Sequence, residues 1–316
     1  MLNVTYHTPV MLQACLEGLN INPQGIYVDV TFGGGGHSKA ILEKLSSQGH
    51  LYSFDQDTDA EANILQDKKF TFIKSNFRYL KNWLQYYNTI PVDGILADLG
   101  VSSHHFDVAE RGFSIRDDGP LDMRMNQKAT LTAENIINTY DVSHLTEIFN
   151  WYGELHNAHA IAKTIVYNRT NTGPILTTGQ LQSTIKRHLH PAKEKKEMAK
   201  VFQALRIEVN KELDALKEML DASIKILRPG GRLVIMSYHS LEDRIVKNFM
   251  KCGNTKGFIE KDFYGNINSP LHPLKGYPQE ASPEEKEENP RSRSAKLRVA
   301  ELVNKKDTHD TRRNKY

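Results

Sequence analysis

The sequence predicts an α/β fold on a mainly parallel sheet that is interrupted by an all-helical insertion. Between residues 26 and 100, short apolar segments alternate with helical stretches, a pattern typical of βαβ units. From about 104 to 206, helical periodicity takes over and strand signals are lacking. Strand and helix signals return from residue 230 onward.

The first half of the chain holds most of the strand signals. Thr8 and Pro9 have the character of an N-cap and first-turn pair, which predicts a helix with Cys15 and Leu16 on one face. Four short apolar segments follow, each ended by polar or turn residues, and a helix follows the first of them. The expected buried strands are 26–32, 50–57, 70–76 and 92–100.

The second half is mainly helical before the sheet resumes. Thr177 and Gln180 form a capping pair ahead of one helix. A longer helix, apolar on one face from Val209 to Leu227, is expected to end at the Pro-Gly-Gly at 229–231. A strand (230–240), a helix, a long loop (253–290) and a last strand (296–302) complete the chain. We therefore expect a sheet domain in two parts, 1–103 and 207–316 with a basic C-terminal tail, around a helical insert at 104–206.

The composition excludes several classes of protein. Hydrophobic residues make up 39% and charged residues 25% of the 316 residues, as in ordinary globular proteins. No apolar run is long enough for a membrane span, and the first residues lack the features of a signal peptide. Two distant cysteines, Cys15 and Cys252, suit neither a disulfide framework nor a cysteine-based zinc site. We expect a cytoplasmic protein with no membrane partner, and we predict no metal site.

Four consecutive glycines, Gly33 to Gly36, stand between the first strand and its helix. They allow a ligand to approach the backbone closely, and the helix N-terminus behind them offers free N–H groups. A P-loop is excluded because Ser38, Lys39 and Ala40 stand where its final Gly-Lys-Ser/Thr belongs. A dinucleotide fingerprint fits better but lacks its third glycine. A tight turn alone needs only one or two glycines, so we expect a ligand-binding loop.

Three acids follow expected strands. Asp29 precedes the glycine loop, where it suits an amino-acid group better than a pyrophosphate, and Asp55 can accept hydrogen bonds from two ribose hydroxyls. Asp98 ends the fourth strand in DLGVSS. Because the carboxyl ends of parallel strands share one edge of a sheet, we expect the three acids to converge there. The set favours a nucleoside that carries a sulfonium amino acid.

Seven motifs extend over nearly the whole chain, and two of them, RGFS…DGPLDMRM and HSLEDRIVK, are specific. They are HTPVML (7–12), DVTFGGGGHS (29–38), DLGVSS (98–103), ERGFSIRDDGPLDMRM (110–125), FQALRIEVN (202–210), GGRLVIMSYHSLEDRIVK (230–247) and NPRSRSAKLRVAE (289–301). In this order they resemble the RsmH (MraW) family, the bacterial 16S ribosomal RNA cytosine-N4 methyltransferases.

The resemblance implies a Rossmann-like class I methyltransferase sheet whose all-helical insert recognises the substrate. It also implies S-adenosylmethionine as cofactor and 16S rRNA or the small ribosomal subunit as partner. The family usually has glutamine where this chain has His105 and a second glutamate where it has Leu155, so the contact at residue 105 can differ in geometry or pH dependence. The implied cofactor contacts are Gly35, Gly36, His37, Asp55, Phe77, Asp98 and His105.

The residues themselves favour methylation of an amine over methylation of cytosine carbon-5. The exocyclic amine of cytosine is a poor nucleophile, and an acceptor against its N–H would assist it; we assign that catalytic role to Asp98. Carbon-5 chemistry needs a thiolate near this motif, and we expect both cysteines to lie away from it. Candidates for stacking on the target base are Phe106, Phe113 and Tyr238, although core packing is the more common role for each.

Two other functions are compatible with the glycine loop and the acids at the strand ends. An NAD-linked oxidoreductase could use the same sheet, and a non-catalytic RNA-binding module could retain the fold, although such a module need not keep a cofactor site. His156 and His159 share a helical face but lack a third metal ligand in the sequence.

Two basic groups are candidate phosphate contacts, with pairing to the acidic run 284–288 as the alternative for the first. They are Arg291, Arg293, Lys296 and Arg298, and Lys186, Arg187, Lys193, Lys195 and Lys196.

Overall fold

The computed structural model describes residues 9–303 and divides into two compact units. An α/β unit comprises the residues up to Gly100 and from Asp214 onward, and a helical unit comprises Val101–Leu213. The second division lies beyond residue 206 because α9 (Glu194–Asn210) continues past that point. The N-cap predicted at Thr8 and the basic tail beyond 303 lie outside the described residues. No helix between residues 9 and 303 is long and apolar enough to cross a membrane.

One mixed sheet forms the centre of the α/β unit, in the order β3-β2-β1-β4-β5-β8-β6, with β7 also paired to β8. The strands from β3 to β5 run parallel, and β8 runs antiparallel to β5. The strand order reverses where β1 meets β4, which is where open α/β sheets bind their ligands. The strands are β1 (Ile26–Asp29), β2 (His50–Asp55), β3 (Phe70–Lys74), β4 (Val92–Asp98), β5 (Leu227–Ser237), β6 (Leu271–Pro273), β7 (Gln279–Glu280) and β8 (Lys296–Leu302).

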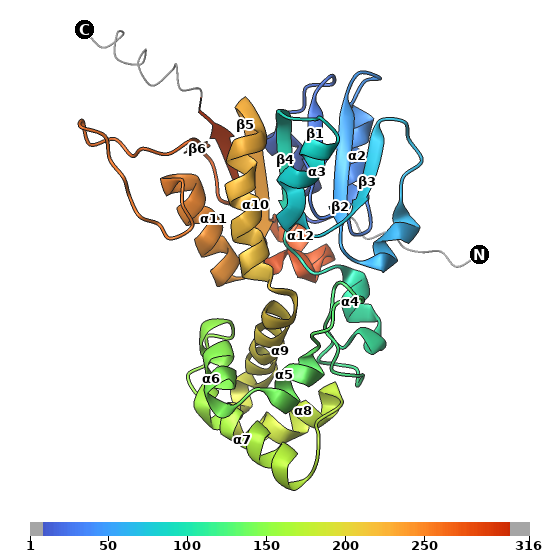
Figure 1. Cartoon of the computed structure of the whole chain (residues 1–316), viewed down its shortest axis with the longest axis vertical. Coiled ribbons are helices and arrows are strands. Elements are labelled where there is room, and N and C mark those ends of the chain that lie inside the picture. The colour runs from blue at the N-terminus through green and yellow to red at the C-terminus, as the bar shows by residue number, and fades with distance from the viewer. Residues whose placement is uncertain (1–8, 304–316) are drawn as a thin grey trace. The chain divides into compact units, whose positions relative to one another are not determined.

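Helices cover both faces of this sheet (Figure 1). Because successive strand residues point to opposite faces, Tyr27 packs with α1 (Leu12–Leu19) and α2 (Gly36–Lys44). Its neighbour Val28 belongs to the core on the other face, under α3 (Leu80–Tyr86), α10 (Glu212–Ile226) and α11 (Ser240–Cys252). This layered arrangement confirms the predicted α/β class.

Three local predictions were wrong. The long helix is broken at Lys211, whose left-handed backbone (φ 51°) separates α9 from α10. The Pro-Gly-Gly at 229–231 lies inside β5 and not between helix and strand. The expected loop at 253–290 contains β6, β7 and α12 (Pro283–Glu288), a helix that begins at its Ser282 N-cap. These elements are short, so they carry little periodicity in the sequence.

The helical unit has a hydrophobic core of its own, which includes Leu145, Phe149, Leu181 and Phe202. The predicted capping box of Thr177 and Gln180 is present, and Thr132 and Asn135 form a second one. Its helices are α4 (Ser103–Asp107), α5 (Ala133–Thr139), α6 (Val142–Trp151), α7 (Ala158–Asn171), α8 (Thr178–Ile185) and α9.

Candidate active site

Asp29 anchors the glycine loop from beneath. Its side chain is 1% exposed. Oδ1 accepts from the backbone N–H of Thr31 (3.0 Å), and Oδ2 accepts from the Ser38 hydroxyl (2.7 Å) at the start of α2. Asp29 therefore joins the end of β1 to the helix behind the loop, and we interpret it as a positioning residue and not as a ligand for an amino-acid group.

The four glycines of the loop fall into two pairs with different surroundings. A Cβ on Gly33 or Gly34 would meet no atom within 4 Å, so their faces border open space. A Cβ on Gly36 would lie 2.3 Å from the Pro9 ring, and one on Gly35 would lie 3.0 Å from the Phe32 ring. The loop therefore has an open half that can face a ligand and a packed half that sets the start of α2.

Asp55 ends β2 beside the open half of the loop. Its Oδ2 accepts from the backbone N–H of Gly33 (2.8 Å), and its Oδ1 accepts from the N–H of Asp57 (2.9 Å). A carboxylate oxygen can accept more than one hydrogen bond, so Asp55 can hold the loop and still accept from ribose hydroxyls.

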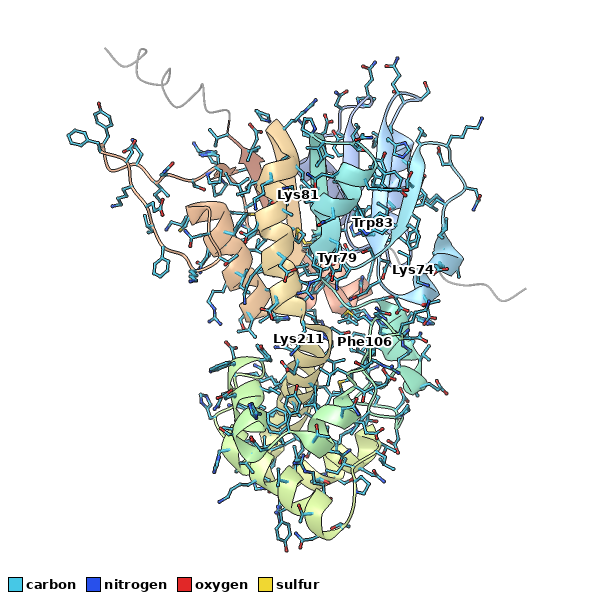
Figure 2. The ribbon with its side chains drawn as sticks, in the orientation of Figure 1. Lys74, Tyr79, Lys81, Trp83, Phe106 and Lys211 are labelled. Atoms are coloured by element: carbon cyan, nitrogen blue, oxygen red, sulfur yellow. The ribbon has the colours of Figure 1, made fainter. Side chains whose placement is uncertain are left out.

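Phe77 follows β3 at the same edge of the sheet, half-buried against the core that lies under α3 and α10. The preceding Asn76 donates from Nδ2 to the side-chain oxygen of Gln56 (2.8 Å), which joins the chain after β3 to the chain after Asp55. Tyr79, two residues further along the chain, is exposed, and Figure 2 labels it together with Lys74, which ends β3. Sequence reasoning missed Gln56, Asn76 and Tyr79, because single polar and aromatic residues carry no pattern.

Asp98 ends β4, and polar groups from several elements surround its side chain. Its backbone N–H donates to the Thr31 hydroxyl (2.7 Å), and its Oδ1 accepts from the N–H of Gly100 (3.2 Å). His37 Nδ1 lies 3.9 Å from Oδ2. The other ring nitrogen of His37 lies 3.1 Å from the carbonyl of Val10, which can only accept, so Nε2 carries a proton.

Burial raises the pKa of Asp98 above its ordinary value, although His37, the Tyr238 hydroxyl and the Gly100 N–H oppose the rise. Burial and the nearby Asp98 carboxylate raise the pKa of Tyr238 well above its usual range. Tyr238 therefore remains a hydroxyl that donates to Asp98. A Cβ on Gly100 would lie 2.7 Å from the Tyr238 ring, so glycine there lets the ring pack against the loop after β4.

Cys15 lies closer to this edge than the sequence suggested. Burial raises its pKa well above the usual range, and the carboxylates of Asp98 and Asp29 raise it further. A thiol in this environment stays protonated at neutral pH and is a poor nucleophile. Cys252 is also buried, at the end of α11. Amine chemistry remains favoured, now because of the pKa of Cys15 and not because of its distance.

Several residues that the sequence singled out belong to the helical unit. His105 is 5% exposed and stacks on Phe113, with ring centroids 4.7 Å apart. Phe113 is buried in the helical core, so packing is its role, whereas Phe106 is 37% exposed. His156 and His159 are exposed, and no third ligand joins them among the described residues.

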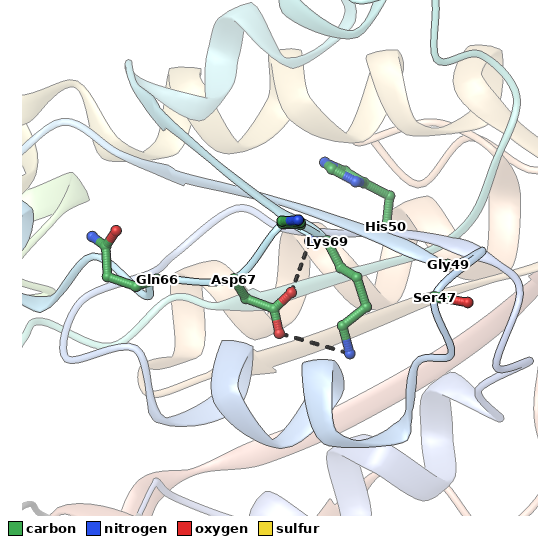
Figure 3. A pocket seen from close by; sticks show the side chains of 7 residues that line it. Ser47, Gly49, His50, Gln66, Asp67 and Lys69 are labelled. Atoms are coloured by element: carbon green, nitrogen blue, oxygen red, sulfur yellow. Dashed lines mark hydrogen bonds and ion pairs between the residues drawn. The ribbon is translucent and has the colours of Figure 1, made fainter.

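A hollow at the opposite edge of the sheet looks like a second site but has a structural explanation (Figure 3). It lies beside the start of β2, and Lys69 is its central cation. Lys69 Nζ donates to the carbonyls of Leu42 (2.9 Å) and Leu45 (3.0 Å) and pairs with Asp67. The lysine therefore caps the C-terminus of α2.

The members of the first basic group, at 291–298, differ in their contacts. Arg298 forms two hydrogen bonds with Asp243 of α11, at 2.7 and 3.1 Å, so it is a structural residue and a poor phosphate contact. The partner of Arg298, Asp243, does not belong to the acidic run 284–288. In that run Glu285 accepts from the Met11 N–H and Lys286 pairs with Glu280. In the second group, Lys193, Lys195 and Lys196 are exposed.

Comparison with known proteins identifies the family. The profile of the MraW methylase family matches residues 4–303. The chain is 59% identical over 296 residues to the ribosomal RNA small subunit methyltransferase H of Phocaeicola vulgatus, a match that covers 94% of this chain and 97% of that protein. It is 58% identical over 301 residues to the protein of the same name from Bacteroides thetaiotaomicron, covering 94% and 98%. The resemblance drawn from the motifs is confirmed, and the chain belongs to the MraW methylase family.

Proposed function

We propose that the protein transfers a methyl group from S-adenosylmethionine to the N4 amine of a cytidine in 16S ribosomal RNA. The observation that carries the proposal is the edge of the sheet where the open glycine loop, Asp55 and Asp98 all end. The names of the relatives, ribosomal RNA small subunit methyltransferase H, support this class of substrate.

The residues at this edge fit the proposed cofactor. Open space beside Gly33 and Gly34 is the cradle that a Cβ would fill. We assign Asp55 to the ribose hydroxyls and half-buried Phe77 to the adenine. Gly35 is the N-cap of α2, and its own N–H donates to the Phe32 carbonyl (2.8 Å). Gly36 and His37 follow as the first residues of the helix, where N–H groups lack partners within the helix, and these groups suit the carboxylate of the amino-acid moiety. His105 completes the set proposed from the family resemblance.

When bound, S-adenosylmethionine would supply an electrophilic methyl group, and its sulfur would leave as a neutral thioether. In our proposal Asp98 accepts a hydrogen bond from the amine N–H, which turns the nitrogen lone pair out of the ring and toward the methyl group. The Tyr238 hydroxyl and the Gly100 N–H hold the carboxylate in place. Once the N–C bond has formed, the amine loses one proton, which Asp98 can take up and release to water.

We propose that the helical unit, with its exposed Lys193, Lys195 and Lys196, recognises the RNA. The target base must leave its stack to be reached. Exposed Phe106 on the helical unit is an aromatic candidate to hold it, and exposed Tyr79 on the α/β unit is the alternative. We also propose that the protein works in the cytoplasm, where ribosomal subunits are assembled.

Mapping of methylated cytidines tests the proposal. 16S rRNA from cells that lack the protein should lose one N4-methylated cytidine, and purified protein with S-adenosylmethionine should restore it. Free rRNA and assembled subunits, tested side by side, identify the substrate form. If wild-type protein bound NAD and not S-adenosylmethionine, the oxidoreductase alternative would replace this one. RNA binding without cofactor binding would indicate a non-catalytic module.

A further inference from the structure

The segment between α11 and β6 exposes an unusual concentration of apolar side chains. Among the described residues, twelve large hydrophobic side chains are exposed, and five of them lie between 258 and 267. Phe263 is 98% exposed and Tyr264 is 69% exposed, and their rings meet edge to face at 5.5 Å. Single exposed apolar residues are common, but a cluster of this kind marks an interaction site.

A hairpin that is closed by backbone hydrogen bonds carries the cluster. Lys261 and Ile267 form an antiparallel bridge, and the N–H of Asn268 donates to the carbonyl of Glu260 (2.8 Å). At the tip, Asp262 Oδ1 accepts from the N–H groups of Tyr264 and Asn266, both at 2.9 Å. The hydrogen bonds fix the turn, so Phe263 and Tyr264 are presented at its end.

The base of the hairpin is fastened to α11. Asn254 accepts from the N–H of Phe258 (3.0 Å) and donates to its carbonyl (2.7 Å). A Cβ on Gly257 would lie 2.9 Å from the Asn248 side chain of α11, so the two are in close contact. In Figure 1 the segment, in orange, extends outward beside α11.

The surroundings of the hairpin are basic. Between residues 244 and 275 there are six lysines and arginines and only two acids, whereas the whole chain has a net charge of only +3. Lys247, Lys251, Lys256 and Lys261 are exposed. One of the two acids, Asp262, is already bonded to the backbone of the turn. Aromatic rings among lysines suit a polyanion whose bases can stack, which is single-stranded RNA.

The hairpin lies away from the edge that carries Asp98. Asp98, at the end of β4, pairs with Met236, whereas Gly94, near the beginning of β4, pairs with Arg232, which in turn pairs with Glu301 of β8. Leu271, the first residue after the hairpin segment, pairs with Leu302. The hairpin therefore leaves the sheet at the amino edge, opposite the proposed site of methyl transfer.

We propose that this hairpin is a second RNA contact, in which Phe263 and Tyr264 stack on unpaired bases while the neighbouring lysines hold phosphates. That this RNA is ribosomal rests on the proposed function. Because the hairpin lies at the opposite edge of the sheet from Asp98, we expect it to affect the affinity for RNA and not the chemical step.

A tryptophan reporter tests the contact directly. The fluorescence of Phe263→Trp should be quenched by a single-stranded oligoribonucleotide, more weakly by an RNA duplex, and less at high salt. The control is Tyr86→Trp, because Tyr86 is exposed to a similar extent (74%) at the end of α3, where no RNA contact is proposed, and should not respond. No quenching at position 263, or a response to anionic lipid vesicles instead of RNA, would overturn the proposal.

A double variant tests the consequence for the enzyme. Phe263→Ala with Tyr264→Ala should raise the KM for RNA roughly tenfold, as expected for the loss of base stacking, and leave the single-turnover rate at saturating RNA unchanged. Tyr86→Ala, which removes an aromatic ring that is 74% exposed elsewhere, is the control. An unchanged KM, or an equal loss in the control, refutes the hairpin contact while wild-type methylation still supports the proposed function. RNA-dependent quenching without any methylation would refute the proposed function alone.

Discussion

Asp98 is assigned to chemistry in an environment that makes its charge costly. Its raised pKa means that the folded protein binds the proton more tightly than the unfolded chain does. Its contribution to stability is therefore present at low pH and is lost as the pH rises through the raised pKa. Asp98→Asn removes the charge and keeps one oxygen that can accept from Gly100 and Tyr238. We predict that the variant melts at a higher temperature than wild type near neutral pH, and that this difference shrinks as the pH falls.

The same variant should lose activity, which separates stability from function. Single-turnover rates at saturating S-adenosylmethionine measure the chemical step apart from cofactor binding, and we expect a large decrease there. A normal rate would reduce Asp98 to a binding residue. A melting temperature below that of wild type at neutral pH would show that the contacts of the carboxylate with Gly100 and Tyr238 outweigh its burial.

Tyr238 gives an independent test of the Asp98 assignment. Tyr238→Phe removes the hydroxyl that stabilises the carboxylate, so the pKa of Asp98 should rise further. If ionised Asp98 is required, the loss of rate on the acid side of the pH profile should begin at a higher pH than in wild type. A rate that falls equally at all pH values would instead indicate that the hydroxyl affects the reaction without changing the pKa of Asp98.

Asp55 is the residue on which cofactor affinity should depend most. Asp55→Ala removes the acceptor for two ribose hydroxyls and also releases the N–H of Gly33, so we expect binding to weaken by about 2–3 kcal/mol. Titration calorimetry with S-adenosylmethionine measures this. Asp67→Ala removes an acid at the opposite edge of the sheet and should leave the affinity unchanged. Equal affinities for the two variants would remove Asp55 from the site.

At the scale of the element, the glycine loop makes a prediction that separates binding from folding. Gly34→Ala places a methyl group in open space without a positive φ, so its melting temperature should stay near that of wild type. The same methyl group would occupy the proposed cradle and weaken S-adenosylmethionine binding. Gly36→Ala meets the Pro9 ring at 2.3 Å and should lower the melting temperature. If Gly34→Ala bound the cofactor normally, the open half of the loop would not be part of the site.

The sequence predicted the elements whose signals are local. The first four strands are each present within their predicted ranges, because apolar runs ended by polar residues are a direct signature of buried strands. The break at Lys211 was not predictable, because the apolar spacing continues through it while the backbone turns. The role of Tyr238 also escaped prediction, since its contact with Asp98 joins β4 to the chain after β5.

At the scale of the whole molecule, charge should decide how strongly RNA binds. Lys193, Lys195 and Lys196 are exposed at the start of α9, and we propose that they contact phosphates. Each phosphate contact releases counterions, so RNA affinity falls linearly with salt on logarithmic axes. Replacing all three lysines with glutamine should weaken RNA binding at low salt and reduce the slope by roughly 2. Binding assays over a range of salt concentrations measure both.

The appropriate control removes the same charge from elsewhere in the chain. Three exposed lysines lie at the amino edge of the sheet. Lys44 ends α2, Lys68 lies just before β3, and Lys225 lies in the last turn of α10. Their replacement with glutamine lowers the net charge equally but removes no proposed contact. If both triple variants reduce the slope to the same extent, the RNA responds to total charge, and the helical unit has no specific phosphate site. A smaller slope in the α9 variant alone, with S-adenosylmethionine affinity intact, would indicate a phosphate-binding surface on the helical unit.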